Sequence, residues 1–213
     1  MNTKPIIRWA CYAALTESEM QKLTRDDLLS LEQYAEERPA FRDNVMAHKK
    51  NRRLDLGTNA ALYFEDRLTM QNQIQEMLRI ERIFEADGIN EELEVYNALI
   101  PDGSNWKATF MIEFPEVLER QQMLEQLVGI ENRVYVQVAD FDRVFAIADE
   151  DLERADDTKT SAVHFMRFEF PPEQSAALRS GASLIVGIDH ENYRVEISPV
   201  ADNIRESLLI DLN

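Results

Sequence analysis

Three side chains have the types that metal binding or acid–base catalysis needs: Glu81, Glu85 and His164. Carboxylate oxygens and imidazole nitrogens bind divalent metals and also act as general acids and bases. The two glutamates lie in EDRLTMQNQIQEMLRIERIFEAD, residues 65–87, and His164 lies in SAVHFMRFEF, residues 161–170. If the fold brings these segments together, the three side chains would form a carboxylate–histidine site.

The same residues also have a purely structural interpretation. On a helical projection Glu81 falls near the middle of an apolar face, and Glu85 falls nearer its edge. A carboxylate in that position requires an ion pair or hydrogen bonds, which an arginine of another element would supply. His164 shares a strand face with apolar side chains, where a histidine is more often a hydrogen-bonded core residue than a ligand. The sequence leaves both interpretations open.

Two further pairs carry weaker signals. Asp189 and His190 lie in a predicted hairpin turn, whose geometry suits both residue types, and they would need converging ligands to bind a metal. Trp106 and Lys107 follow a turn-rich segment. They would form a pocket wall and an anion contact there, unless Trp106 simply begins a core strand. No motif indicates a cofactor, since the chain lacks a Gly-rich phosphate loop, a G-x-S-x-G elbow and an H-E-x-x-H pair.

The composition argues against several classes of function. A net charge of −17 is unfavourable for a nucleic-acid partner, because phosphate binding requires a basic surface. The single cysteine, Cys11, cannot build a disulfide framework, an iron–sulfur cluster or a cysteine zinc site within the chain. No stretch approaches the roughly 18 apolar residues of a membrane span, and residues 6–15 lack the flanks of a signal peptide. We therefore expect a cytoplasmic protein without a membrane partner.

Helical patterns dominate the first half of the chain. We predict two helices that are separated at Pro39, then a small hairpin, the long central helix over residues 65–87 ended by Gly88, and a short helix over 90–97. The one basic cluster, HKKNRR at residues 48–53, is predicted to be the solvated end of the second helix, with a small anion site as the alternative.

The second half has the period-two alternation of strands, and it repeats its own plan. A strand, a helix and two strands form a first unit at residues 104–150, and the same order forms a second unit at 160–199. FMIEFPE at 110–116 resembles FMRFEFPPE at 165–173. Repeats of this size pair into one sheet or into two packed sheets.

These patterns predict an α+β fold: a helical N-terminal part with a long central helix, then a mixed, largely antiparallel sheet from two strand–helix–strand–strand repeats. We expect residues 1–21 to be an extension outside the fold and residues 22–213 to form a single domain. Its expected parts are a mainly helical part at 22–98, the units at 104–150 and 160–199, and a C-terminal helix at 200–213.

Six stretches link the chain to a known family. They are KLTRDDLLSLEQY, AHKKNRRLDLG, FEDRLTMQNQIQEMLRIERIFE, YNALIPDGSNWKATFMIEFP, IADEDLERADDTKTSAVHFMRFEF and VGIDHENYR. In these stretches the chain resembles, from about Lys22 to its end, a bacterial family of uncharacterised proteins catalogued as domain of unknown function number 3501. The resemblance implies no catalytic residue.

The same resemblance implies genomic neighbours that are rubrerythrin-like proteins and iron–sulfur proteins of the heterodisulfide-reductase kind. It therefore implies a role near peroxide defence or intracellular redox chemistry. We expect an accessory or binding protein that works with such a redox partner. The alternative is a metal-dependent enzyme with a carboxylate–histidine site between the two repeat units.

Overall fold

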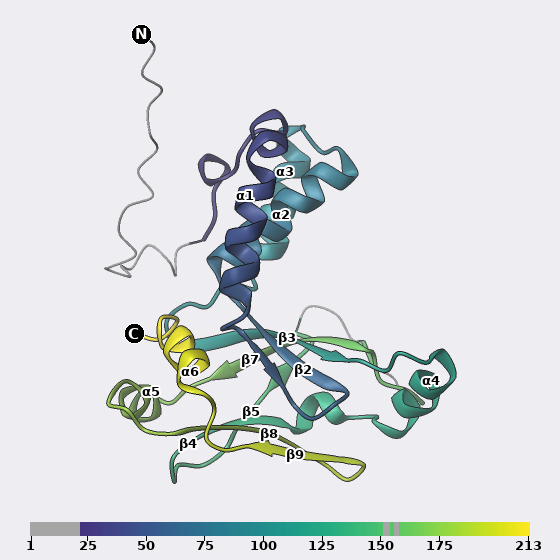
Figure 1. The fold of residues 1–213 in the computed structure, drawn as a ribbon, viewed down its shortest axis with the longest axis vertical. Helices are drawn as coiled ribbons and strands as arrows, with labels where there is room; N and C mark the ends of the chain where they lie inside the picture. Colours follow the sequence, from purple (N-terminus) through teal and green to yellow (C-terminus); the bar gives the residue numbers. More distant parts are fainter. Residues whose placement is uncertain (1–21, 151–153, 156–157) are drawn as a thin grey trace.

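Two antiparallel sheets pack against each other, and a group of helices stands on the outer side of one of them (Figure 1). The computed structural model describes residues 22–150, 154–155 and 158–213. The helices are α1 (Leu31–Lys49), α2 (Arg67–Glu81), α3 (Ala86–Asn97), α4 (Val117–Gln126), α5 (Pro172–Arg179) and α6 (Asp202–Leu209), with short 3-10 turns η1 (Arg25–Asp27) and η2 (Ile130–Arg133). The strands are β1 (Arg53–Asp55), β2 (Ala60–Glu65), β3 (Asn105–Ile112), β4 (Val134–Val138), β5 (Val144–Phe145), β6 (Ile147–Ala148), β7 (Val163–Glu169), β8 (Leu184–His190) and β9 (Tyr193–Ile197).

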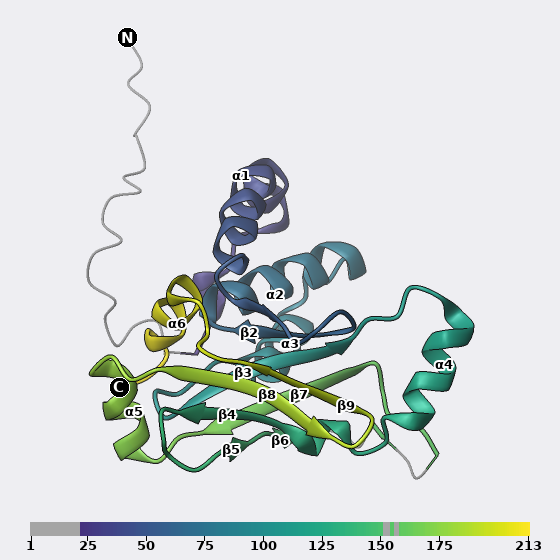
Figure 2. The same ribbon diagram turned by 60° about the horizontal axis from the view of Figure 1, so that its bottom comes forward.

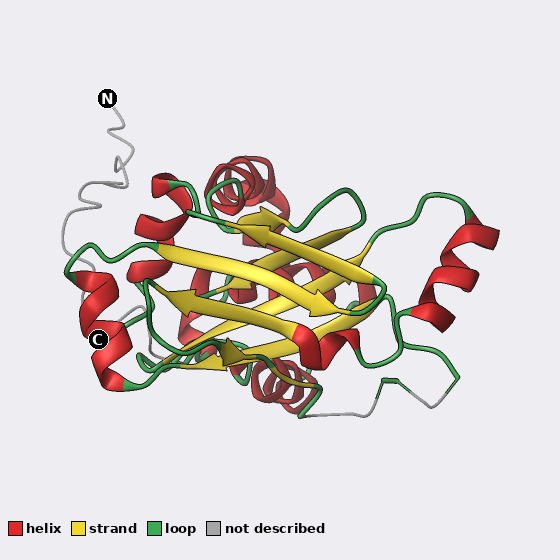
Figure 3. Cartoon of the chain, turned by 90° about the horizontal axis from the view of Figure 1, so that it is seen from below, coloured by secondary structure: helices red, strands yellow, loops and turns green. Residues whose placement is uncertain are grey.

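The strands divide between a five-stranded sheet, in the order β1-β2-β3-β7-β6, and a four-stranded sheet, in the order β5-β4-β8-β9 (Figure 3). In each predicted unit the helix carries the chain from one sheet to the other, from β3 to β4 and from β7 to β8. The prediction of mixed helix and sheet is confirmed. The largely antiparallel pairing is confirmed as well, since all strand ladders of the described residues are antiparallel. The strands form two packed sheets, one of the two expected arrangements, and neither sheet is mixed within these residues. The internal duplication itself stays a prediction.

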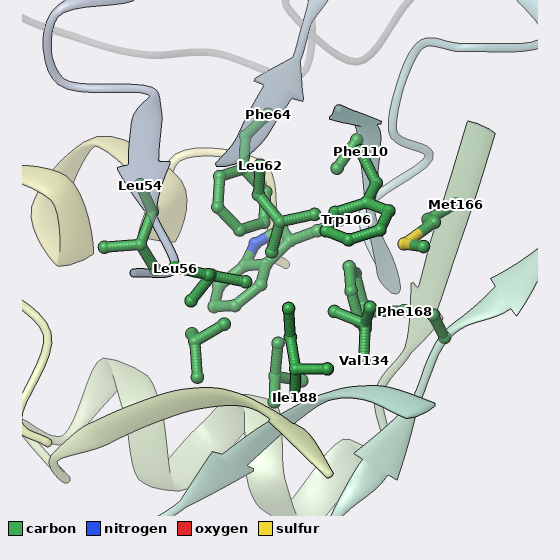
Figure 4. Packing of buried hydrophobic residues seen from close by; sticks show 14 of the residues in the cluster. Leu54, Leu56, Leu62, Phe64, Trp106, Phe110, Val134, Met166, Phe168 and Ile188 are labelled. Carbon is green, nitrogen blue, oxygen red and sulfur yellow. The ribbon is translucent and has the colours of Figure 1, made fainter. Parts of the chain in front are cut away.

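The main hydrophobic core fills the space between the two sheets (Figure 4). Strand β3 shows why these residues form a strand: Trp106, Ala108, Phe110 and Ile112 are buried and alternate with half-buried side chains, as the period-two pattern predicts. Trp106 is fully buried, and its indole meets Phe170 edge-on with ring centroids 4.5 Å apart. Its Nε1–H donates to the carbonyl of Leu208 at 2.9 Å, which ties α6 to the core.

The helical half differs from the prediction in two places. Residues 31–49 form one helix, α1, that contains Pro39, and not two helices that meet at it. Ser30 caps α1, and its side chain accepts from the Gln33 backbone N–H. The predicted central helix ends early, at Glu81, because Arg82 takes the left-handed conformation (φ 58°). Gly88 therefore lies inside α3 and does not end the helix before it.

A second, smaller core holds the helices together. It consists of Leu23, Met70, Ile74, Leu78, Leu93 and Ile100. Figure 2 shows α4 at one end of the sandwich, with α5 and α6 at the other. No helix in the described part of the chain is long and apolar enough to cross a membrane. The expected extension at 1–21 lies outside the described residues.

Candidate functional site

His164 lies on β7, is fully buried, and has a carboxylate on each side of its ring. Its Nδ1 is 2.6 Å from Oδ2 of Asp149, and its Nε2 is 2.9 Å from Oγ1 of Thr160 and 3.0 Å from the carbonyl oxygen of Ser161. The Thr160 hydroxyl donates in turn to Glu131 at 3.1 Å. Asp149 directly follows β6, and Glu131 lies in η2, so both carboxylates belong to the first predicted unit. His164 and Thr160 belong to the second unit, and this polar cluster therefore joins the two.

The hydrogen bonds of this cluster define what it can do chemically. Nε2 faces a carbonyl, which only accepts, so Nε2 carries a proton. On the other side of the ring, Nδ1 forms a 2.6 Å hydrogen bond with Oδ2 of Asp149. Asp149 adopts a left-handed backbone (φ 54°) and also accepts from the Phe165 N–H at 3.2 Å. These hydrogen bonds therefore link β7 to η2 and to the residue that follows β6, where the two units meet.

The geometry does not suit a metal ion. Asp149 and Glu131 approach opposite edges of the imidazole, whereas one ion needs ligands that converge on one point. Among the described residues, no group of three or more His, Cys, Asp or Glu side chains is arranged to hold a metal.

Glu81 and Glu85 do not lie near this cluster. Both are exposed, at the end of α2 and just before α3, and the described contacts of His164 include neither of them. The prediction that Glu81 faces the buried side of the helix is wrong, because Glu81 is itself exposed, as is Ile80 (62%). The buried polar residues of α2 are Thr69 and Gln75. The side-chain amide of Gln75 accepts from the N–H of Leu29 and donates to its C=O.

Asp189 and His190 end strand β8 and fix the hairpin turn. His190 Nε2–H donates to the Val128 carbonyl at 3.1 Å, and Nδ1 accepts from the Asn192 N–H at 3.2 Å. Asp189 pairs with Arg143 and Arg194. Both residues line an open polar cleft of about 820 Å³, but their hydrogen bonds are those of a structural turn.

Trp106 and Lys107 point to opposite faces of β3, because side chains alternate along a strand. Trp106 belongs to the core and does not form a pocket wall. Lys107 is half-buried on the outer face of the five-stranded sheet, where it lines a cleft of about 590 Å³ under α3. The structure therefore separates the predicted pair and leaves Lys107 in a cavity.

The turn between α2 and α3 carries an exposed apolar surface. Phe84 is 69% exposed and lines a cleft of about 380 Å³. The apolar walls of this cleft are Leu28, Leu29, Leu31, Leu78, Ile83 and Ile89. We call Ile80, Phe84 and this cleft the α2–α3 surface.

Acidic residues surround the α2–α3 surface. Glu81, Glu85 and Asp87 are exposed in the same turn. Partial burial and the neighbouring carboxylates of Glu81 and Glu91 raise the pKa of Glu92. The surface thus combines an apolar centre with a rim in which acidic side chains outnumber the basic Arg25 and Arg82.

A family model described as "Protein of unknown function (DUF3501)" matches residues 22–212. The chain belongs to this family. The chain is similar to a novel protein of unknown function from Burkholderia pseudomallei K96243, whose crystal structure superposes with a TM-score of 0.86 and whose sequence is 48% identical. The match covers 91% of this chain and 100% of the Burkholderia chain. No curated protein matches.

The DUF3501 chain also has a buried ionic cluster that sequence reasoning missed. Arg52, from the predicted solvated end HKKNRR, is 2% exposed. Its guanidinium pairs with Asp66, the N-cap of α2, at 3.2 Å, and with Asp211 near the C-terminus. Asp66 also pairs with His48, a half-buried residue of α1. The cluster fastens the helices of this DUF3501 protein to its sandwich and C-terminal segment.

The pKa values of the two carboxylates in this cluster, Asp66 and Asp211, are shifted in opposite directions by their surroundings. Burial would raise the pKa of Asp66, but Arg52 and His48 hold it at about 2. Burial raises the pKa of Asp211 to about 6, although Arg52 opposes the rise. Arg53, the first residue of β1, has a side chain that is 42% exposed. The only sequence signal that distinguishes it from Arg52 is the alternation of an extended chain, which points neighbouring side chains in opposite directions.

Proposed function

We propose that this DUF3501 protein is a cytoplasmic binding protein without chemistry of its own, and that it docks a protein partner on the α2–α3 surface. The observation that carries the proposal is Phe84, a large aromatic side chain that is 69% exposed at the edge of an apolar cleft. Exposed aromatic side chains with apolar pockets beside them are typical of protein-binding sites.

The rim of the surface defines the chemistry of the partner. Glu81, Glu85 and Glu92 would repel an acidic protein and attract basic groups. The partner would insert an apolar segment into the cleft, with lysine or arginine residues on either side of it. Such contacts exclude a bilayer or a nucleic acid as the ligand, because the rim is negative.

The family resemblance supports one class of partner. Rubrerythrin-like proteins and iron–sulfur proteins of the heterodisulfide-reductase kind are the expected neighbours, and we propose that one of them binds here. The competing proposal, a metal-dependent enzyme with a carboxylate–histidine site between the units, receives less support. The two carboxylates that contact His164 lie on opposite sides of its ring, and the ring is fully buried.

Binding of purified partner proteins to the immobilised chain tests the proposal. Wild type should bind a rubrerythrin-like or iron–sulfur protein from the same organism saturably, and Phe84→Ser should weaken binding at least tenfold, as expected for a central aromatic anchor. Leu118→Ser is the matched control, because Leu118 is 75% exposed on α4, away from this surface.

Charge reversal then tests the rim. Glu81→Lys with Glu85→Lys should slow association, and added salt should weaken wild-type binding, because exposed charges act at long range and are screened. Failure of both partner proteins to bind wild type would overturn the proposal. Equal binding by the Phe84→Ser and Leu118→Ser variants would overturn it as well.

A further inference from the structure

A second cleft lies between α3 and the outer face of the five-stranded sheet, and it contains a lysine in an unusual environment. One wall consists of Val95, Tyr96 and Leu99 from α3 and the residues after it. The floor contains Lys107 from β3 with Phe165 and Arg167 from β7, in a cavity of about 590 Å³.

The two cations of the floor lie side by side but differ in their partners. Lys107 and Arg167 are paired across β3 and β7, so their side chains share one face of the sheet. Arg167 is compensated by Glu150, with two contacts of 2.8 Å, and by Glu169 at 2.5 Å. Among the described residues, none forms an ion pair within 4.0 Å of the Lys107 ammonium.

The environment of Lys107 disfavours the charged form of its side chain. Burial, and then the neighbouring Arg167, lower the pKa of Lys107, whereas Glu150 and Asp102 only partly offset this. A bound anion would replace the lost water and relieve the repulsion from Arg167.

The charge and the walls together identify a class of ligand. Arg167 pairs with Glu150 and Glu169, and Arg154 of the same lining pairs with Asp149, so the Lys107 ammonium is the cation that a ligand's carboxylate would contact. Because these carboxylates balance the cations of the cleft, a monoanion is favoured over a phosphate dianion. Glu150 and Glu169 would repel a second negative charge. Val95, Leu99 and Phe165 offer apolar contact to the rest of the molecule.

We propose that this cleft, the Lys107 cleft, binds a small organic monocarboxylate with an apolar body. Its carboxylate would pair with the Lys107 ammonium, and its apolar part would lie between α3 and Phe165. The site is distinct from the α2–α3 surface, and its occupancy does not depend on a protein partner.

Calorimetric titration of the full chain with phenylacetate, benzoate and isovalerate tests the proposal. At least one of the three should bind wild type with a Kd of about 1 mM or below. Lys107→Met should weaken that binding at least tenfold, and Val95→Glu should weaken it by adding a negative charge at the mouth. Lys50→Met removes an exposed lysine at the end of α1 and should bind as wild type does.

Neutral and doubly charged probes complete the test. 2-Phenylethanol should bind more weakly than phenylacetate, and inorganic phosphate should not displace the carboxylate. The proposal is overturned if none of the three carboxylates binds, if Lys107→Met binds as wild type does, or if phosphate competes equally. Phe84→Ser should leave carboxylate binding unchanged, which separates this result from the outcome for the partner-binding surface.

Discussion

Replacing Arg52 with methionine should destabilise the protein far more than the same change at Arg53. The Arg52 guanidinium donates to the carbonyls of Phe64, Glu65 and Ser207, each at 3.1 Å, besides its pairs with two carboxylates. Without the guanidinium, Asp66 and Asp211 lose the buried positive charge that pairs with them. Breaking a buried ion pair in this way costs about 3–5 kcal/mol.

Urea unfolding followed by tryptophan fluorescence measures this cost. With an m-value of about 2 kcal/mol per molar, a loss of about 4 kcal/mol lowers the urea midpoint by about 2 M. Arg53 makes exposed pairs with Asp55 and Glu113, so Arg53→Met should cost less than about 1 kcal/mol. Adding Asp211→Asn to Arg52→Met should recover part of the loss, because one stranded charge disappears.

The comparison of adjacent arginines makes the result decisive. Equal midpoints for Arg52→Met and Arg53→Met would refute the assignment of the buried ionic cluster. If Arg52→Met does not fold, Arg52→Lys serves instead, since lysine keeps the charge but loses the planar fork. The urea midpoint of Arg52→Lys should lie between that of wild type and the one predicted for Arg52→Met.

Three further changes have expected outcomes. His164→Ala removes a fully buried imidazole and its 2.6 Å hydrogen bond to Asp149, and should lower the free energy of unfolding by about 2–4 kcal/mol in urea titrations; no change would contradict the hydrogen-bonded cluster. Asp211 has a folded pKa of about 6 against an ordinary value of 3.8, so it favours folding as pH falls from about 7 to 4. Asp211→Asn should remove a contribution on the order of 2 kcal/mol from the pH profile of stability, and identical profiles would count against the assignment. A Cβ at Gly187 would lie 2.6 Å from the Tyr135 hydroxyl, so Gly187→Ala should lower the free energy of unfolding by about 1–3 kcal/mol and with it the thermal midpoint. An unchanged thermal midpoint would refute the close packing.

Local patterns predicted the strands well. The alternation at 106–112 identifies β3 and the inward face of Trp106, because a strand between two layers must bury every second side chain. The same alternation, applied strictly, separates Lys107 from Trp106. The division into two sheets depends on contacts between distant residues, such as β4 with β8, which periodicity does not contain.

The helical half was harder to predict because one residue changes its geometry. The left-handed Arg82 ends α2, so the helical projection that placed Glu85 near the edge of the apolar face does not apply beyond residue 81. The partners of His164 were missed for a different reason. Glu131 and Asp149 are distant in sequence, and no local pattern marks either one as buried next to the ring.

Hydrogen–deuterium exchange of the chain, alone and with the redox partner protein, tests the central claim most directly. The docking proposal predicts slower exchange over residues 78–92, which span the end of α2 and the first half of α3, with no change in α4. Protection confined to another part of the molecule, or an unchanged pattern at saturating partner, would contradict the claim that the α2–α3 surface is where this DUF3501 protein binds.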